Sequence, residues 1–304
     1  MLARIAITAI ILAILAMGID MGLALRAMAA IDLRYLALVL GLVAVDRCVM
    51  ILRWLLLLRA RDIRISARDA TRLFLVSSFV GSFLPSGIGG DAARAYGLAR
   101  DATTGSEAVA SVAVERLLGV LSLVVLAVFG VAAWTNSGEG DWRLVAAVAA
   151  GATACASAFW ANEILRAVIP DQHHDGFVAR RVLTIADAVG QYRAHRGVLL
   201  HVMVWSIIVQ VLRVTQAYLL GIGLGIDVPF AYYLLFMPLG LLLLLLPISV
   251  SGFGVPQAGF VWMLQPQGVP GTQSLALSTL IVLTGLAGNL SGLVLWLRQR
   301  REIL

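Results

Sequence analysis

Residues 73–97 read LFLVSSFVGSFLPSGIGGDAARAYG, an apolar segment of roughly membrane-spanning length that is interrupted near its centre. Pro85 disfavours helical backbone at the residue before it, and Gly87, Gly89 and Gly90 permit turns that residues with side chains rarely adopt. Bent backbone at membrane depth is tolerated only where it is buried in protein or lines a water-filled cavity. The segment therefore predicts a hairpin of two short helices rather than one straight span.

A second apolar segment, residues 230–264, is interrupted in a similar way. Its prolines and glycines are Pro238, Pro247, Gly252, Gly254 and Pro256. The loops that flank the two segments predict that the first hairpin opens from the inner side and the second from the outer side. Two interrupted segments that enter from opposite faces are typical of inverted-repeat transporters. The alternative is a pair of ordinary proline-kinked helical hairpins.

The whole chain is too apolar for an ordinary soluble protein. Of its 304 residues, 61% are hydrophobic and only 13% are charged, whereas a soluble domain carries roughly 25% charged residues. Further apolar runs near spanning length are 5–25, 36–58, 109–134, 144–160, 198–224 and 275–297. We therefore expect an all-α fold, a polytopic integral membrane helix bundle with two oppositely oriented re-entrant or broken-helix hairpins. A cleaved signal peptide is the alternative for the first run, but Asp20 and Arg26 make a poor cleavage region.

The basic residues indicate the orientation of the bundle. All 23 are arginine, and they concentrate in residues 59–72, in residues 161–197 and in the C-terminal tail. By the positive-inside rule, both termini and these two loops are predicted to lie in the cytoplasm. The arginines alternate with apolar spans and lack an aromatic stacking face, so nucleic-acid binding is not expected.

The chain is predicted to form one transmembrane domain over residues 1–304. Its first half covers about 1–160, its cytoplasmic loop covers 161–197, and its second half covers 198–304. Residues 179–192 within the loop are predicted to form a short amphipathic helix, whose arginines contact either anionic headgroups or only solvent.

The sequence after the first proline carries a candidate anion site. Asp91 is predicted to cap the start of the second short helix, and Arg94 shares a helical face with it. Together with Ser86, Gly89 and Gly90, they could bind a phosphate at the helix start. The alternative is a plain helix cap with a salt-bridge partner. The glycines are not a nucleotide-binding loop, because no Gly-Lys-Ser or Gly-Lys-Thr sequence follows.

Glu115 and Arg116 are predicted to lie inside a membrane span, where unpaired charges cost several kcal/mol. Adjacent residues point about 100° apart on a helix, so each needs a partner on another helix. The candidate pairs are Glu115 with Arg94 or Arg47, and Arg116 with Asp91 or Asp46. A structural ion network and a headgroup site explain these charges equally well.

Two more spans carry polar groups. Asp46 and Arg47 lie in the second span, with Arg53 on the same face as Asp46. Gln210 and Arg213 belong to a stripe that recurs every third residue in the span 198–224 and continues to Gln216. Such a stripe is expected to face the protein interior or a wet groove. Arg213 is the best candidate for binding an anionic group within the bilayer, and hydrogen bonding between helices is the alternative.

The second interruption adds Ser249 as a candidate for the outer half of a headgroup path, or as part of a close-packed kink. We expect no catalytic residue, no metal site and no cofactor. The histidines do not form a ligand set with the few carboxylates, and no Gly-x-Ser-x-Gly motif is present.

Three motifs, in this order and spacing, resemble the lysylphosphatidylglycerol synthase transmembrane-region family. They are FLPSxIGGDxxR at 83–94, SxxxERxxG at 111–119 and PISxxGxG at 247–254. The resemblance covers nearly the whole chain. The family includes the flippase-like domain of the multiple peptide resistance factor, stand-alone inner-membrane proteins and hopanoid-associated proteins. The resemblance to the resistance factor implies a domain that moves aminoacylated phosphatidylglycerol to the outer leaflet, while a separate soluble domain makes that lipid.

Two departures from the family limit what the resemblance implies. The sequence stops at Leu304 without a synthase domain, so lysyl transfer is not expected of this chain. Family members often carry an Arg-Glu pair after the last Gly-x-Gly-Val, where this chain has Pro256 and Gln257. Lysylphosphatidylglycerol is therefore not carried over as the substrate.

The leading hypothesis is an inner-membrane lipid flippase-like transporter. It would move or bind an anionic or aminoacylated phospholipid, or a related hopanoid or polyprenyl lipid. The alternatives are an intramembrane transferase that uses Asp91 or Glu115 as general base, and an accessory subunit of a lipid-modifying enzyme. A homo-oligomer is compatible with each hypothesis.

Overall fold

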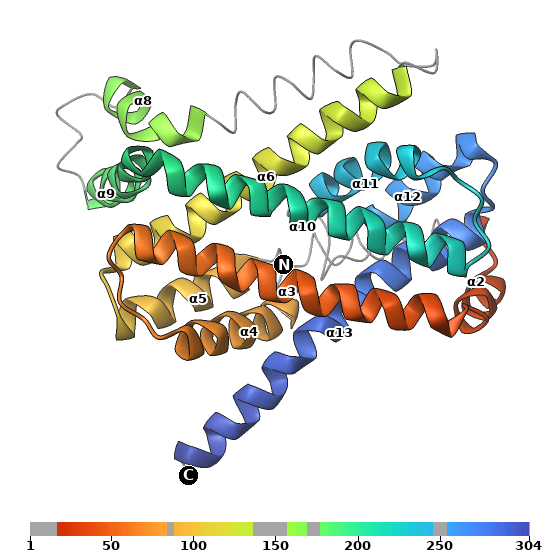
Figure 1. Cartoon of the computed structure of the whole chain (residues 1–304), viewed down its shortest axis with the longest axis horizontal. Helices are drawn as coiled ribbons and strands as arrows, with labels where there is room; N and C mark the ends of the chain where they lie inside the picture. The colour runs from red at the N-terminus through yellow and green to blue at the C-terminus, as the bar shows by residue number, and fades with distance from the viewer. Residues whose placement is uncertain (1–16, 84–87, 136–156, 169–176, 246–253, 304) are drawn as a thin grey trace.

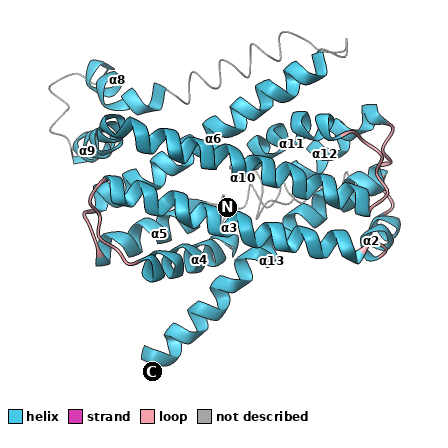
Figure 2. Cartoon of the chain, in the orientation of Figure 1, coloured by secondary structure: helices cyan, strands magenta, loops and turns pink. Residues whose placement is uncertain are grey.

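The computed structural model describes residues 17–83, 88–135, 157–168, 177–245 and 254–303, and these residues form helices with no strand among them (Figures 1 and 2). Among these described residues, four helical segments are long and apolar enough to cross a membrane. They are Leu33–Ala60, Gly105–Ala132, Val182–Gly223 and Gly271–Leu297. The expectation of an all-α membrane helix bundle is confirmed. Ser86 and Ser249 lie outside the described residues, as does most of the predicted span 144–160.

Helices α3 (Leu33–Ala60) and α10 (Arg196–Gly223) form an antiparallel pair along their whole lengths (Figure 1). The backbone N–H of Asp32 donates to the carbonyl of Gly223 at 3.2 Å, at one end of the pair. Each helix has 28 residues, or roughly 42 Å at 1.5 Å per residue. This pair supplies one wall of the polar interior described below.

The first interrupted segment forms the predicted hairpin. Helix α4 (Ala67–Phe83) ends before Pro85, and α5 (Ile88–Asp101) begins after it. The two helices run antiparallel and touch through glycine, since a Cβ on Gly81 would lie 2.7 Å from the Cα of Gly90. A larger residue at either position would therefore force the hairpin apart.

The second interrupted segment differs from the prediction at Pro238. That proline lies inside α11 (Phe230–Leu245) instead of ending it, and α12 (Val255–Leu264) follows. Proline has no N–H to donate to the carbonyl of Leu234, four residues earlier. Helix α6 (Gly105–Thr135) packs closely there, because a Cβ on Gly130 would overlap the carbonyl group of Leu234. The missing hydrogen bond is thus accommodated at a close helix contact.

The two hairpins pack toward opposite ends of α3 (Figure 1). Phe74 and Leu98 of the α4–α5 hairpin share a core with Trp54, in the second half of α3. Phe236 of α11 and Phe260 of α12 share a core with the first half of α3. The depth at which each hairpin ends in a membrane stays a prediction.

The last long helix, α13 (Gly271–Ile303), joins α3 and α4. Gly292 packs directly on the backbone of Leu75 in α4, and Gly288 packs on Val43 and Arg47 in α3. Gly288 and Gly292 therefore allow close packing of this span against α3 and α4.

The first predicted span, 5–25, is not one continuous helix. The backbone leaves the helical conformation at Ile19 and Asp20, and a separate helix, α2 (Met21–Ala29), follows. The Asp20 carboxylate accepts a hydrogen bond from the N–H of Leu23 at 3.0 Å, so it caps this new helix. Residues 1–16 lie outside the described part of the chain.

The polar loop folds as short helices at one end of the bundle (Figure 1). A 3-10 turn, η1 (Ala158–Trp160), leads into α8 (Ala161–Val168). The predicted amphipathic helix is confirmed as α9 (Phe177–Gln191), and a second 3-10 turn, η3 (Tyr192–His195), connects it to α10.

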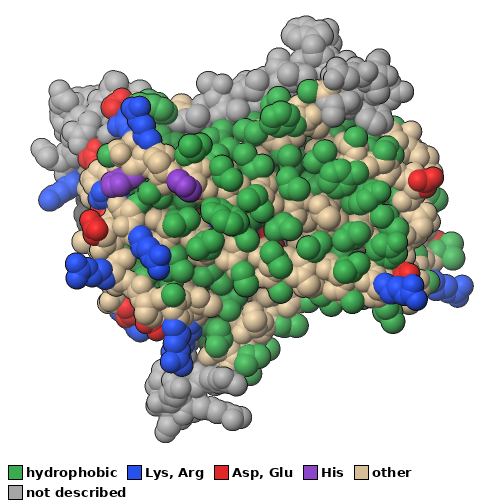
Figure 3. All heavy atoms as spheres, in the orientation of Figure 1, with side chains coloured by type: hydrophobic (Ala, Val, Ile, Leu, Met, Phe, Trp, Pro, Cys, Tyr) green, Lys and Arg blue, Asp and Glu red, His purple; other side chains and the backbone are tan. Residues whose placement is uncertain are grey.

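The molecular surface has the pattern of a membrane protein. Figure 3 shows hydrophobic side chains across the middle of one face, with most charged side chains at its two ends. Exposed hydrophobic residues of α3 and α10 include Leu38, Val45, Leu200 and Val204. A broad apolar band with charged edges is what a bilayer-embedded protein presents to lipid and headgroups.

Candidate functional site

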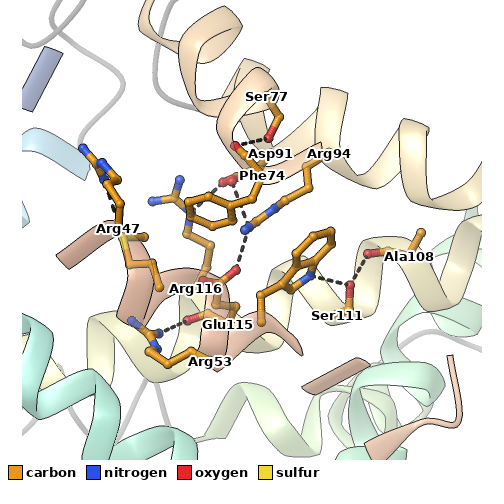
Figure 4. Close-up of polar contacts among 12 residues, drawn as sticks. Arg47, Arg53, Phe74, Ser77, Asp91, Arg94, Ala108, Ser111, Glu115 and Arg116 are labelled. Atoms are coloured by element: carbon orange, nitrogen blue, oxygen red, sulfur yellow. Dashed lines mark hydrogen bonds and ion pairs between the residues drawn. The ribbon is translucent and has the colours of Figure 1, made fainter. Parts of the chain in front are cut away.

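The first charged cluster joins the α4–α5 hairpin to α6 (Figure 4). Arg94 Nη2 lies 2.7 Å from Glu115 Oε2 and 3.4 Å from Asp91 Oδ1. Arg116 Nε lies 2.6 Å from Asp91 Oδ2. Of the pairings that the sequence left open, Glu115 with Arg94 and Arg116 with Asp91 are confirmed. Helix α5 begins at Ile88, three residues before Asp91, so this carboxylate pairs with guanidinium groups instead of serving as the expected cap.

Arg94 is held between two aromatic rings. Its guanidinium carbon lies 4.9 Å from the centre of the Trp54 ring and 5.0 Å from that of Phe74. Arg94 is 4% exposed, as is Glu115. Cation–π contacts and a charged partner together compensate for the burial of this guanidinium. The aromatic partners could not be identified from the sequence, because they come from α3 and α4.

Arg53 is a member of the polar interior that we did not select from the sequence as a site residue. It is 3% exposed, and its Nη2 donates to the backbone carbonyl of Glu115 at 3.3 Å. It interacts electrostatically with Glu115 on one side and with Asp46 on the other. Its position seven residues after Asp46 was the available signal, since such residues share a helical face.

The second charged cluster lies between α3, α10 and α13. Asp46 Oδ1 lies 3.1 Å from Arg213 Nε, and Asp46 Oδ2 lies 3.5 Å from Arg47 Nη1. Arg47 Nη2 also donates to the carbonyl of Gly285 at 3.2 Å. One carboxylate therefore pairs with two guanidinium groups, and one positive charge remains.

A cavity of about 260 Å³ adjoins this second cluster. Its walls come from α3, α10, α11 and α13, and its polar lining is Asp46, Arg47, Arg213, Gln216, Thr284 and Asn289. Three buried atoms in this lining have no hydrogen-bond partner among the described residues. They are Arg47 Nε, Gln216 Nε2 and Asn289 Oδ1.

The other candidate residues have different surroundings. Gln210 is buried, does not line the cavity, and donates to Gly119 O and Ser122 Oγ of α6, both at 3.3 Å. Gly90 forms the close contact with α4 and packs on the carbonyl of Ser77, and Gly89 lies beside it in the first turn of α5.

Arginines outnumber carboxylates across the two clusters. The five guanidinium groups of Arg47, Arg53, Arg94, Arg116 and Arg213 face the three carboxylates of Asp46, Asp91 and Glu115. Two positive charges are thus left over across the two clusters. The Arg116 side chain is 50% exposed, so it lies at the surface, whereas the other four arginines are buried or half-buried. Buried charge of this kind in a membrane protein marks a binding or transport path more often than a structural necessity.

Comparison with known families gives one match. The profile described as lysylphosphatidylglycerol synthase TM region matches residues 1–291. The chain belongs to the lysylphosphatidylglycerol synthase transmembrane-region family. The resemblance carried by the three sequence motifs is confirmed, and the family links this membrane protein to lipid handling. Searches of curated proteins and of solved structures gave no match.

In this member of the lysylphosphatidylglycerol synthase transmembrane-region family, Gln257 has a local structural role. It is 1% exposed, and its Oε1 accepts a hydrogen bond from the backbone N–H of Gly254 at 2.6 Å, at the start of α12. Gly254 has a φ of 99°, in a region that favours glycine.

Within the described residues, no group of three His, Cys, Asp or Glu side chains could hold a metal ion.

Proposed function

We propose that this chain is a lipid flippase-like transporter of the cell inner membrane that moves an anionic or aminoacylated phospholipid between leaflets. The observation that carries the proposal is the excess of guanidinium over carboxylate groups inside the bundle, next to a cavity. Guanidinium groups bind phosphate through two parallel hydrogen bonds. Acyl chains would remain in the bilayer while the headgroup passes through the polar interior.

Each interrupted hairpin lies against one of the charged clusters. Helix α5 of the first hairpin carries Asp91 and Arg94, and α11 of the second hairpin lines the cavity with Met237 and Leu241. A small movement of either hairpin would therefore change access to a charged cluster. We propose that alternate movement of the two hairpins opens the polar interior to one leaflet at a time.

Exchange of ion-pair partners is the proposed driving interaction. Asp46 pairs with both Arg47 and Arg213, and a lipid phosphate can replace Asp46 as the partner of either guanidinium. One charged hydrogen bond then replaces another of similar strength. The two states differ by little in free energy, as a transport cycle requires.

The proposed orientation rests on an arginine-rich end of the bundle. Arg61, just after α3, lies 2.7 Å from Glu107 of α6 and also donates to Gln191 of α9. The hydrogen bond to Glu107 raises the pKa of Arg61 above its usual value, so this guanidinium stays charged. The contacts join residues 59–72 to the loop 161–197 at one end, which we propose is cytoplasmic together with both termini.

Reconstitution in liposomes tests the function. We expect the purified chain to accelerate transbilayer movement of a fluorescently labelled phosphatidylglycerol, and Arg213→Ala to reduce the rate at least roughly tenfold, since a charged hydrogen bond contributes about 1.5–3 kcal/mol. Arg196→Ala is the matched control, because Arg196 is exposed at the start of the same helix.

Three results would contradict the proposal. They are an unchanged rate in Arg213→Ala, a covalently altered lipid product, and activity only after a second protein is added. The second result would indicate a transferase, and the third would indicate an accessory subunit.

A further inference from the structure

Around the cavity, hydrogen-bond donors without a partner outnumber acceptors without a partner among the described residues, and the net charge is positive. Arg47 Nε and Gln216 Nε2 are buried N–H donors without a partner among the described residues. Arg213 is 27% exposed at its side chain, and its remaining N–H groups add further donors next to the cavity. Such a set is complementary to the oxygens of a phosphate group.

Hydrogen bonding fixes the orientation of the Asn289 amide. The single hydroxyl proton of Ser82 is donated to the carbonyl of Ser78 at 3.0 Å. Ser82 Oγ therefore accepts from Asn289 Nδ2, at 2.8 Å. Asn289 Oδ1 is left as a buried acceptor at the cavity wall, without a partner among the described residues. A hydroxyl group on the ligand would satisfy this acceptor.

The cavity offers no uncommitted carboxylate for a cationic group. Asp46 is the only acidic residue in its described lining, and both of its oxygens face guanidinium nitrogens at 3.1 and 3.5 Å. The ammonium groups of an aminoacylated headgroup would enter a site that already has an excess positive charge. They would be repelled and would have no anionic partner.

The cavity volume limits what can enter. About 260 Å³ is below the usual range of roughly 300–1,000 Å³ for pockets that enclose a drug-sized ligand. A phosphate with a small alcohol is of suitable size, whereas the acyl chains of a phospholipid must lie outside.

We infer that this cavity is a binding site for a phosphodiester monoanion whose alcohol is neutral and hydroxylated, such as the headgroup of unmodified phosphatidylglycerol. Arg47, Arg213 and Gln216 hold the phosphate, and Asn289 Oδ1 accepts from the alcohol. The inference deepens the proposed function, because it selects an anionic over an aminoacylated substrate. It concerns binding, so it can be tested without transport.

The test measures lipid competition in detergent micelles. Purified chain is loaded with fluorescent phosphatidylglycerol, which is displaced by unlabelled phosphatidylglycerol, lysylphosphatidylglycerol or phosphatidylethanolamine. We expect phosphatidylglycerol to compete at least roughly tenfold better than either other lipid. Equal or better competition by lysylphosphatidylglycerol overturns the inference, whether or not the chain moves lipid in liposomes.

Two variants with matched controls locate the site. Arg213→Gln is expected to weaken phosphatidylglycerol binding roughly ten- to hundredfold, while Arg196→Gln leaves it unchanged. Asn289→Asp adds a carboxylate at the cavity wall and is expected to shift the preference toward lysylphosphatidylglycerol. Ser291→Asp, an exposed site two residues along the same helix, adds the same charge without that shift. A gain of lysylphosphatidylglycerol binding cannot result from misfolding, and its absence in Asn289→Asp contradicts the assignment.

Competition with a headgroup that has no acyl chains distinguishes a lipid from a soluble ligand. Glycerophosphoglycerol carries the same headgroup without acyl chains, and we expect it to compete in a manner that depends on Arg213 but more weakly than the lipid. Competition as strong as that of the lipid would support the same headgroup chemistry and assign it to a soluble phosphodiester. Competition that does not depend on Arg213 would overturn the site.

Discussion

Arg94 shows how one buried charge can organise the surroundings of several helices. Its guanidinium lies 2.7 Å from Glu115 of α6 and rests between Trp54 of α3 and Phe74 of α4. Burial removes the hydration of both charges, so the pair is stable only while both partners are present. The residue therefore connects four helices, including its own α5, through interactions that depend on one another.

Removal of either charge of this pair is expected to destabilise the protein. Arg94→Met leaves the Glu115 carboxylate buried without its partner, at a cost of about 3–5 kcal/mol. The double variant Arg94→Met, Glu115→Gln should lose less than the sum of the two single variants, because no unpaired charge remains. Thermal unfolding in detergent measures all three.

The control for this pair is an exposed one. Arg100 and Asp101 lie 2.9 Å apart with side chains 71% and 58% exposed, and surface pairs contribute little. Arg100→Met should therefore leave the melting temperature nearly unchanged. Additive effects at Arg94 and Glu115 would show that the pair is not coupled.

At the scale of helices, glycine decides which elements can approach closely. Gly130 of α6 contacts the carbonyl of Leu234 in α11, at the hydrogen bond that Pro238 cannot make. Gly81 and Gly90 likewise allow α4 and α5 to approach closely. The first contact therefore fixes the second hairpin to α6, and the second contact joins the two helices of the first hairpin, and neither leaves room for a side chain.

Gly130→Ala is expected to destabilise the α6–α11 contact by about 1–3 kcal/mol through overpacking. Gly41→Ala in α3 is expected to stabilise the protein instead, because nothing lies within 4 Å of a Cβ there and alanine favours a helix over glycine by about 1 kcal/mol. Unfolding of both variants in the same detergent checks the sign. Equal effects at the two positions would contradict the role of Gly130.

The sequence predicts the elements better than the contacts between them. Pro85 with its glycines marks the end of α4 and the start of α5, because these residue types act locally on the backbone. Pro238 did not end α11, since a proline inside a helix is tolerated where neighbouring packing accommodates the lost hydrogen bond. Asp20 was taken for a residue inside a span, although its side chain caps α2.

The candidate site could be predicted in part. The need to pair charges within a span gave two candidate partners for Glu115 and two for Arg116, and the structure shows Arg94 and Asp91 as the partners. Asn289 was not selected from the sequence as a site residue, because its place in the cavity depends on contacts with helices far away in the sequence. No local pattern indicates that Arg47 meets Gly285, 238 residues further along the chain.

At the scale of the whole molecule, the proposed orientation in the membrane follows from where the arginines lie along the chain. We expect a cysteine at Arg64, in the arginine-rich loop, to react with a membrane-impermeant thiol reagent only from the cytoplasmic side. A cysteine at Asp227, in the exposed loop after α10, should react only from the other side. The test uses a chain in which Cys48 and Cys155 are replaced by alanine. Reaction of both positions from one side would contradict the topology.

The most direct test of the proposed transport path is whether the cavity is reached by water from both sides of the membrane. In the same cysteine-free background, Gln216→Cys places a thiol in the cavity lining, and Gln210→Cys places one on the same helix but against α6. We expect the thiol at position 216 to react with an impermeant reagent added to either side, and more slowly in excess phosphatidylglycerol, while the thiol at position 210 stays protected. Reaction from one side only, or no reaction at position 216, would show that this cavity is not part of a path between the leaflets.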